Sequence, residues 1–392
     1  MAATATASGS TLAPPPLSTA ERTLVLSALL NSDPPHRAHA RPPLAFRPIQ
    51  LETDVLPSAH GSARLIWGVG GAGGGGFDTE AVTEVLVGVS VEVKKVDARE
   101  PPVVCSVEVD PALQHSLSAP YSTESISSSL TTLLSSALSP TSTSEDDDDE
   151  EGIIFPLSQR TVIPDQSHWH FYIDATILSL SAGNLVDATF AAVFAALSDV
   201  RIPRTRQVRF RAEGGAVAAG EGEGERQKGD ELGMIKQKRV DRAVDFELLQ
   251  DDTGFGGDRL RNWEAIPVCV TVSLLPHTVL LDADATESLV VPSQIHVIAS
   301  STGHIYSIHF AGPGGFWESS SSSAGAHKAS GGSLPIGTFD PNESIQRGMG
   351  SRFEAVKNAI KVGVNSASAL ATVLCKQIEE QQRVREERLL AG

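Results

Sequence analysis

The sequence predicts an α+β fold, in which helices pack on sheets. Two blocks have the alternating apolar pattern of strands, the first over residues 49–109 and the second over residues 246–310. Helical patterns lie between these blocks and again in a long tract over residues 344–388. The order of β-rich block, helices, β-rich block and helix is typical of the α+β class.

The composition limits both the size of the core and the class of partner. With 392 residues, of which 41% are hydrophobic, the chain can form one large domain or two ordinary ones. Its formal net charge is −17, to which the acidic run 145–151 contributes seven negative charges. This balance excludes nucleic-acid binding by bulk positive charge, so any RNA contact must come from local basic patches or partner subunits.

Targeting signals and cysteines point to the inside of a cell. The N-terminus lacks the basic start and apolar core of a signal peptide, and no apolar run reaches the ~18 residues that a membrane span needs. The three cysteines lie far apart, between apolar residues and with no metal-ligand spacing: Cys105, Cys269 and Cys375. We expect them to be buried, reduced thiols, and we expect no metal and no cofactor.

The first β-rich block follows a short helix. Residues 1–16 are rich in Ala, Thr, Ser and Pro and are predicted to be disordered. Ser18 and Glu21 have the spacing of a capping box, which predicts a helix through about Leu30. After a Pro-rich connector, strands are predicted near residues 49–57, 61–68, 84–96 and 103–109.

A strand, a tight turn and a helix form the centre of the chain. Trp169 to Leu180 is rich in β-branched and aromatic residues, as a buried strand should be. Turn-forming residues 181–184 follow, and then an Ala-rich helix over 184–197 that is apolar on more than one face. A turn before such a helix can hold an anion, because its free backbone N–H groups point outward. A second helix, polar on its outer face, is predicted over 122–138.

The remaining segments set the predicted domain organisation. Residues 17–392 are expected to form a single domain, with a first half at about 44–205 and a second half at about 245–392. Disordered insertions are predicted at about 70–78, 139–152 and 211–242, and a low-complexity loop at 319–333. Strands of the second half are expected at 246–249, 266–275, 278–281, 293–300 and 305–310.

Several ordered blocks of the sequence resemble ribonuclease PH-like proteins. They are RAHARPPLAFR, LETDVLPSAHGSARLIWG, TEVLVGVSVEV, YIDATILSLSAGNLVDATFAAVFAALSDVRIPR and DDTGFGGDRLRNWEAIPVCVTVSLLPHTVLLDADATESLV. The resemblance implies a ribonuclease PH fold of the ribosomal protein S5 domain 2-like type, with two β-α halves and helices packed on mixed sheets. It also implies a six-membered ring of such subunits in the RNA exosome core, with single-stranded RNA passing through the centre.

The resemblance allows three parts of the family's catalytic site, which we call stations, to be compared with this chain. Active relatives resemble Gly-Gly-Thr-Arg at the central turn, where this chain has Asn184 and then Leu185 in place of the phosphate-binding arginine. Of two metal-holding aspartates, the first corresponds to Asp282, whereas Ser288 stands at the second. An arginine cluster after the first sheet has no counterpart, since residues 110–138 contain neither Arg nor Lys. We therefore expect no catalytic site and no enzymatic activity.

Two other hypotheses stay open. The chain could be an active phosphate-dependent 3′–5′ exoribonuclease if Asp282, Asp284 or Glu287 rebuilt a metal site and a partner lent arginines. On a strand, Asp282 and Asp284 would share one face. A free-standing, monomeric RNA-binding module is the third class.

The arginines outside these stations have two interpretations. One is solvated surface and inter-subunit salt bridges. The other is a set of contacts along the RNA path, for which the resemblance favours Arg64, Arg204 and Arg206. The arginines in question are Arg37, Arg41, Arg47, Arg64, Arg201, Arg204, Arg206, Arg209 and Arg211.

The expected partners and location also come from the resemblance. They are other ring subunits, cap subunits with RNA-binding domains and single-stranded RNA, with no DNA and no membrane. The same resemblance implies the nucleus, nucleolus and cytoplasm as locations.

Overall fold

The computed structural model describes most of the two β-rich blocks and the helices around them. The described residues are 17–30, 35–37, 40–68, 82–95, 101–116, 122–139, 154–164, 166–180, 183–208, 245–249, 257–275, 278–291, 293–311 and 341–391. The predicted segments 1–16, 70–78, 211–242 and 319–333 lie outside them, as does 139–152 apart from Ser139.

The first sheet is mixed and takes its order from one long central strand. Along the main path the order is β1-β2-β3-β6-β4, and β5 also pairs with β6. Only the β4–β6 pair is parallel among the pairs described in this sheet. The strands are β1 (Ile49–Thr53), β2 (Gly61–Trp67), β3 (Thr83–Lys95), β4 (Val103–Val109), β5 (Thr161–Ile163) and β6 (Ser167–Leu180).

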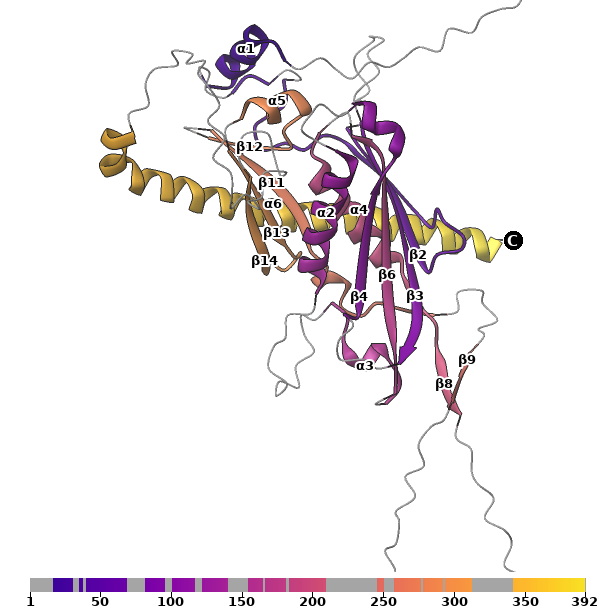
Figure 1. The fold of residues 1–392 in the computed structure, drawn as a ribbon. Helices are drawn as coiled ribbons and strands as arrows, with labels where there is room; N and C mark the ends of the chain where they lie inside the picture. The colour runs from indigo at the N-terminus through magenta and orange to yellow at the C-terminus, as the bar shows by residue number, and fades with distance from the viewer. Residues whose placement is uncertain are drawn as a thin grey trace, which may run out of the picture.

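Alternation explains which face of this sheet is buried. In β3 the valines at positions 85, 87, 89 and 91 are buried, whereas the residues between them are partly exposed. Successive side chains of a strand point to opposite faces, so one face of β3 belongs to the core. The same face is covered by helices, as Figure 1 shows.

The second sheet is antiparallel, and its central strand β11 is buried on both faces. Its order is β12-β11-β13-β14, made of β12 (Val279–Leu281), β11 (Val268–Leu274), β13 (Ser293–Ala299) and β14 (Ile305–Ala311). Six of the seven residues of β11 are buried, because α4 (Leu185–Asp199) packs on one face and α6 (Pro341–Ala391) on the other. On the α6 side, a Cβ added to Gly363 would lie 2.7 Å from a methyl of Val297, so this glycine permits the close approach.

Helix α4 lies between the two sheets and is the most deeply buried helix (Figure 1). Its alanines keep its surface small, and residues 188 and 190–197 are all buried. Gly61 on β2 allows the contact, since a Cβ there would lie 2.6 Å from the carbonyl oxygen of Ala196. Helix α2 (Thr123–Leu138) covers β4 with its apolar face, which includes Ile126, Leu130 and Leu134.

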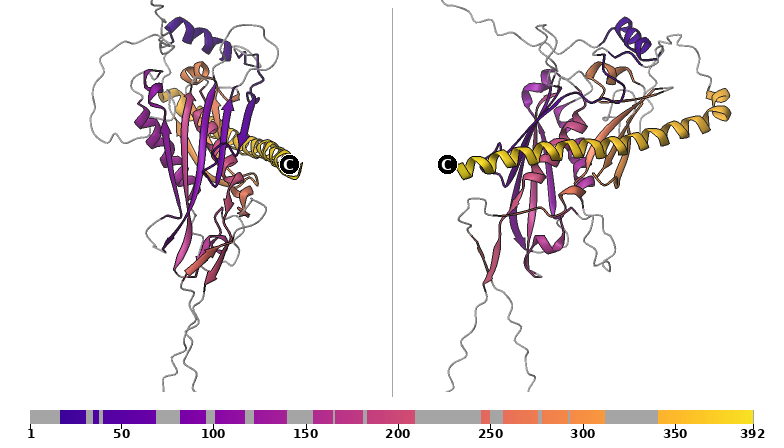
Figure 2. Two further views of the ribbon diagram at one scale, coloured as in Figure 1. Left: turned by 90° about the vertical axis from the view of Figure 1, so that its right-hand side faces the viewer. Right: turned by 180° about the vertical axis from the view of Figure 1, so that it is seen from behind.

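The remaining elements lie around these layers. Helix α6 runs across the second sheet and reaches β1 in the first, as the right-hand view of Figure 2 shows. Helix α1 (Thr19–Leu30) contacts the short α5 (Ala285–Val290) and begins with the predicted capping box, in which Ser18 and Glu21 exchange hydrogen bonds. Short elements complete the fold: α3 (Leu157–Arg160), β7 (Arg201–Ile202), β8 (Thr205–Val208), β9 (Asp245–Leu248), β10 (Asp258–Arg259), η1 (Pro111–Ser116) and η2 (Trp263–Ala265).

The predicted α+β class is confirmed. The predicted strands and helices of both halves are present within a few residues of their expected ends. The first sheet is mixed as expected, whereas every pair described in the second sheet is antiparallel. Within the described residues, the chain has no helix long and apolar enough to cross a membrane.

Candidate functional site

The central turn and Asp282 meet at the N-terminus of α4. Gly183 and Asn184 both have left-handed backbone conformations, with φ of 75° and 53°, and α4 begins at Leu185. The Asn184 side-chain amide donates a hydrogen bond to Oδ1 of Asp282 over 2.9 Å. Two of the sequence-predicted stations, one from each half of the chain, are therefore in direct contact.

The Asp282 carboxylate is fully buried and is surrounded by arginines. Nη1 of Arg41 lies 3.0 Å from Oδ2, and Nη2 of Arg47 lies 2.5 Å from Oδ1. Arg47 also donates from its backbone N–H over 2.6 Å and from Nε over 2.9 Å, both to Oδ2. Charge-assisted bonds of this kind are roughly twice as strong as neutral ones. Burial raises the pKa of Asp282, but the hydrogen bonds and positive charge of Arg47, with the charge of Arg41, outweigh it and lower the pKa overall.

A second buried ion pair lies beside the first. Arg37 donates from Nε to Oε1 of Glu287 over 2.8 Å and from Nη2 to Oε2 over 2.5 Å, which is a two-pronged pair. It also donates to the carbonyl oxygens of Leu281 and Asp282. The solvated-surface interpretation is therefore wrong for Arg37, Arg41 and Arg47. Arg37 is buried, and the side chains of Arg41 and Arg47 are only 13% and 10% exposed. The three residues join the N-terminal connector to the second half of the chain.

The other acidic candidates are also engaged. Asp284 is the N-cap of α5, where its Oδ1 accepts from the Glu287 backbone N–H over 2.7 Å while Glu287 accepts from the Asp284 N–H. Ser288 donates its hydroxyl hydrogen to the carbonyl oxygen of Ala285. The expectation that Asp282 and Asp284 share one face of a strand is wrong, because β12 ends at Leu281 and Asp282 takes a positive φ of 49°.

Residues of the second half pack against the turn at Gly183, which the sequence suggested as an anion-binding turn. A Cβ added to Gly183 would lie 2.9 Å from the backbone nitrogen of Ala285. The Thr83 hydroxyl donates to the Gly183 carbonyl oxygen over 2.6 Å, which ties the turn to β3. Leu185 is partly buried and packs against the main core. In an open turn of this kind, the backbone N–H groups can bind phosphate. Here atoms of the second half lie next to that backbone.

The three arginines proposed to contact RNA form surface ion pairs. Arg64 lies 2.7 Å from Glu84 and 3.5 Å from Glu52, Arg204 lies 2.7 Å from Asp258, and Arg206 lies 2.7 Å from Glu247. Exposed pairs of this kind contribute roughly 0–1 kcal/mol, so phosphate can compete for such arginines. Their role in RNA binding stays a prediction. Arg209 and Arg211 lie outside the described residues.

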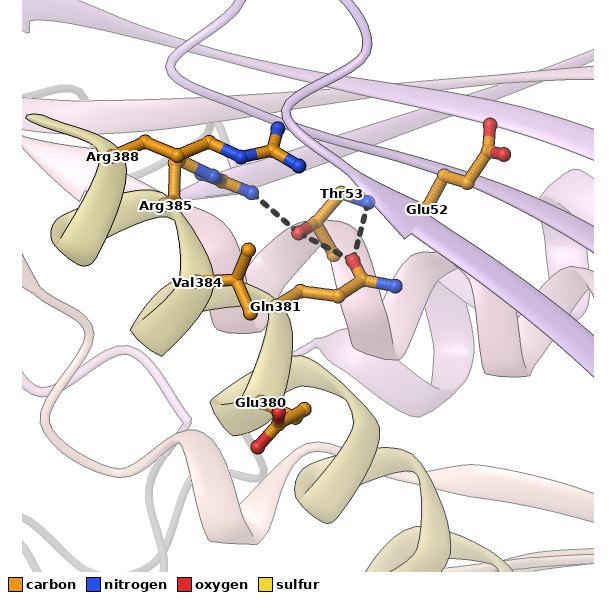
Figure 3. A pocket seen from close by; sticks show the side chains of 7 residues that line it. All are labelled: Glu52, Thr53, Glu380, Gln381, Val384, Arg385 and Arg388. Carbon is orange, nitrogen blue, oxygen red and sulfur yellow. Dashed lines mark hydrogen bonds between the residues drawn. The ribbon is translucent and has the colours of Figure 1, made fainter.

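A hollow of about 300 Å³ lies between β1 and the last turns of α6 (Figure 3). Its polar groups mainly bond one another: Gln381 Oε1 accepts from the Thr53 N–H and hydroxyl, and Arg385 donates to the Thr53 hydroxyl over 2.6 Å. Arg385 also pairs with Asp199 and Asp54. The hollow therefore lies at the interface between α6 and the first half of the chain, which we call the seam. It is lined by Glu52, Thr53, Glu380, Gln381, Val384, Arg385 and Arg388.

Sequence reasoning missed a buried polar cluster under α4. It comprises Asp187, Cys269, Thr271 and His296, which we call the core polar cluster. Burial raises the pKa of Asp187 to about 7 despite hydrogen bonds from Thr271 and Cys269 that lower it. Burial also lowers the pKa of His296 to about 4, which makes its imidazole neutral at pH 7. The available signal was Asp187 itself, a carboxylate in the first turn of a mostly apolar helix.

The cysteine prediction is confirmed in part. All three cysteines are free; Cys105 and Cys269 are buried, whereas Cys375 is only partly buried. Burial raises the pKa of Cys105 to about 12 and that of Cys375 to about 11.

Part of the chain is similar to a known protein family. Residues 45–203 match the model of the 3′ exoribonuclease family, domain 1. No curated protein sequence matches the chain.

Three solved structures have a similar arrangement. Chains of the archaeal exosome core and of the Archaeoglobus fulgidus exosome with RNA bound to the active site are each 18% identical, with a TM-score of 0.49. The first match covers 90% of this chain and 95% of the other, and the second covers 89% and 95%. Rice (Oryza sativa) Rrp46 is 13% identical with a TM-score of 0.43, over 88% of this chain and all of that one. These three likenesses are too distant to carry a conclusion, so the identification rests on the family match: residues 45–203, which hold the first sheet and α4, resemble the first domain of a 3′ exoribonuclease.

Proposed function

We propose that this chain is a non-catalytic, ribonuclease PH-like subunit of the RNA exosome ring, most similar to the subunit called ribosomal RNA-processing protein 42. It helps form the central RNA channel and the interfaces with other ring subunits and with cap subunits that carry RNA-binding domains. In this role it supports rRNA processing and RNA turnover in the nucleus, nucleolus and cytoplasm. The match of residues 45–203 to the 3′ exoribonuclease family supports the class, and the contacts of Asp282 support the loss of catalysis.

The Asp282 carboxylate is the observation that carries this proposal. Phosphate-dependent cleavage needs a carboxylate that can bind a divalent metal together with the substrate phosphates. Here both carboxylate oxygens accept hydrogen bonds from arginines, and Asn184 adds another to Oδ1. A metal could bind only if it displaced two guanidinium groups from a buried position, where an unpaired charge costs several kcal/mol.

The phosphate side of the site is also changed. Leu185 has no positive charge to hold phosphate, and residues 110–138 contain no Arg or Lys that could replace it. The backbone at Gly183 is in contact with the Asp284–Ala285 segment. Metal, phosphate and RNA-backbone positions are thus each altered by different residues.

The active alternative would require more than a partner subunit. Its additional carboxylates, Asp284 and Glu287, form the capping box of α5, and Glu287 also pairs with Arg37. Recruiting either one to a metal would break the capping box at the start of α5, and recruiting Glu287 would also leave the buried Arg37 without its carboxylate. These contacts favour the structural role over a composite active site.

An activity measurement tests the proposal directly. The purified protein, alone and assembled with its ring partners, is incubated with single-stranded RNA, inorganic phosphate and Mg²⁺, and nucleoside diphosphates are measured. We expect the protein alone to release none. Because Asp282→Asn also removes a buried ion pair and lowers stability, the variant is compared only after size determination shows that it still assembles, and the activity of that assembly should be unchanged. Phosphate-dependent release that is lost in an Asp282→Asn variant that still assembles would show that the site is active.

A measurement of assembly tests the proposed partners. Co-expression with ribonuclease PH-like ring subunits and size determination should give a hetero-oligomer. A chain that stays monomeric in their presence, and yet binds RNA, would favour the free-standing RNA-binding module instead.

A further inference from the structure

The core polar cluster is assembled by three elements from the two halves of the chain. Cys269 and Thr271 are two residues apart on β11, so their side chains lie on the same face of the second sheet. His296 is the direct cross-strand partner of Thr271 on β13 and therefore lies on that face as well. Helix α4 covers this face and places Asp187, from its first turn, over the strands.

The side chains of this cluster are in direct contact and away from solvent. Asp187 and Cys269 are fully buried, and His296 is 3% exposed. Thr271 donates to Asp187 twice, from its backbone N–H over 2.8 Å and from its hydroxyl over 2.7 Å. The Cys269 thiol also donates to Asp187. A carboxylate, a thiol and an imidazole from three elements each offer one ligand atom, and these atoms all lie within 4.8 Å of one another.

The hydrogen bonds also fix the state of the imidazole. The Thr271 hydroxyl gives its only hydrogen to Asp187, so towards Nδ1 of His296, 2.8 Å away, it acts as the acceptor. Nδ1 then carries the ring proton, and Nε2 carries the lone pair of the neutral ring. Ligating histidines are held in this way, with one nitrogen donating to a neighbouring group and the other facing the metal.

Charge balance indicates which metal ion the core polar cluster can bind. An ionised carboxylate deep in a core is costly unless a cation is near. Among the described residues, the charged group that acts on Asp187 is another carboxylate, that of Asp282, and no ion pair with Asp187 is formed. A divalent cation bound to one carboxylate, one thiolate and one neutral imidazole gives a site with no net charge. Magnesium and calcium prefer oxygen ligands alone, whereas thiolate and imidazole together favour zinc.

We propose that Asp187, Cys269 and His296 form a structural zinc site that joins α4 of the first half to β11 and β13 of the second. Binding of Zn²⁺ releases the proton of the Cys269 thiol to solvent and replaces its hydrogen bond to Asp187 with a metal–sulfur bond. Zinc donors at about 2.0–2.3 Å from the metal are about 3.4–3.8 Å apart, whereas the three ligand atoms lie within 4.8 Å of one another, so each pair needs to close by at most about 1.4 Å.

The site is structural because no substrate can reach it. All three ligands lie between α4 and the second sheet, and Asp187 and Cys269 have no exposed surface. Zinc held there would stabilise the packing of the two halves. Sequence reasoning could not find it because the ligands come from positions 187, 269 and 296, which follow no short spacing.

The test measures metal in the full-length protein and in matched variants. Protein purified without chelators, and protein dialysed anaerobically with Zn²⁺ and then freed of excess ion, are analysed for bound metal. We expect about one Zn²⁺ per chain in the second sample. Cys269→Ser and His296→Gln should each lower this content at least several-fold, whereas Cys105→Ser, a change at another buried cysteine, should leave it unchanged.

A spectroscopic measurement on the wild-type chain removes the dependence on variants that fold poorly. Co²⁺ in place of Zn²⁺ should give the absorption of thiolate-to-cobalt charge transfer, and added Zn²⁺ should abolish it. Removal of zinc by a chelator should lower the melting temperature, and Zn²⁺ should restore it. If wild-type protein binds no zinc in stoichiometric amount and gives no thiolate–cobalt band, the cluster is a hydrogen-bonded core network and the proposal is wrong. Zinc that Cys105→Ser removes and Cys269→Ser retains would also overturn it.

Discussion

Arg47 forms a two-pronged ion pair with Asp282, which lies 235 residues later in the sequence. Nη2 of Arg47 is 2.5 Å from Oδ1 and Nε is 2.9 Å from Oδ2. This pair connects the segment before β1 to the turn after β12, so it joins the two halves of the chain.

Breaking this pair should destabilise the protein strongly. Arg47→Ala leaves the buried Asp282 with Arg41 as its remaining ion-pair partner among the described residues. We expect a loss of about 3 kcal/mol in the free energy of unfolding, measured by urea denaturation. Arg206→Ala removes an exposed pair with Glu247 and should cost under about 1 kcal/mol. Equal effects of the two changes would contradict a special role for the buried pair.

The same carboxylate should make stability depend on acid pH. The folded pKa of Asp282 is lowered, since Arg47 and Arg41 outweigh the opposing effect of burial. A lowered pKa contributes stability that is present above the unfolded value, about 3.9, and is lost as pH falls through the folded value. The destabilisation caused by Asp282→Asn should therefore be largest near pH 6 and shrink as pH falls below about 4. A difference that stays constant between pH 6 and pH 3 would show that Asp282 has no lowered pKa.

Gly183 should tolerate no side chain. Its φ is 75°, and a Cβ would lie 2.9 Å from the Ala285 backbone nitrogen, so Gly183→Ala combines backbone strain with a clash against the main chain. We expect a loss of about 2–3 kcal/mol in unfolding free energy. Gly303→Ala is the matched control, because its φ is 85° but its nearest neighbour, a methyl of Val364, would be 3.8 Å away. Its cost should be about 1 kcal/mol, from the backbone alone.

The seam between α6 and β1 should open when Arg385 is removed. Arg385 donates to Thr53 and pairs with Asp199 and Asp54, so Arg385→Ala should increase amide hydrogen exchange in β1 and in the last turns of α6. Arg383→Ala, two residues earlier, removes only an exposed pair with Glu380. It should leave the exchange of β1 unchanged. Similar exchange in the two variants would show that the seam does not hold α6 in place.

The surface arginines give a prediction about RNA. If the proposed ring assembly holds, changing Arg64, Arg204 or Arg206 to Ala in that assembly should weaken binding of single-stranded RNA to a similar extent for different sequences. Each lost phosphate contact should reduce the slope of log affinity against log salt by about 0.7. Arg383→Ala serves as a control far from these residues in sequence. An unchanged affinity and slope would assign the three arginines to their surface ion pairs alone.

The strands and helices could be predicted because their patterns are local. The alternating valines of β3 and the apolar, alanine-rich sequence of α4 are each enough to predict which of their residues are buried. The sequence indicated Asn184, Leu185 and Asp282 as site positions, but it could not show that Asn184 and Asp282 touch across 98 residues. Nothing local distinguishes a buried arginine such as Arg37 from an exposed one, because its partner Glu287 lies 250 residues later. The same limit hid the core polar cluster.

The long-range contacts of α6 affect the order in which the chain can fold during synthesis. Gln381 and Arg385 bond Thr53, which lies more than 300 residues earlier, so these contacts of β1 can form only after more than 300 further residues have been synthesised. Contacts of such separation form late and slowly, and the edge of the first sheet stays open until they do. A nascent chain shortened before α6 should therefore be bound by chaperones, whereas one extended past residue 391 with its tunnel-spanning linker should escape them.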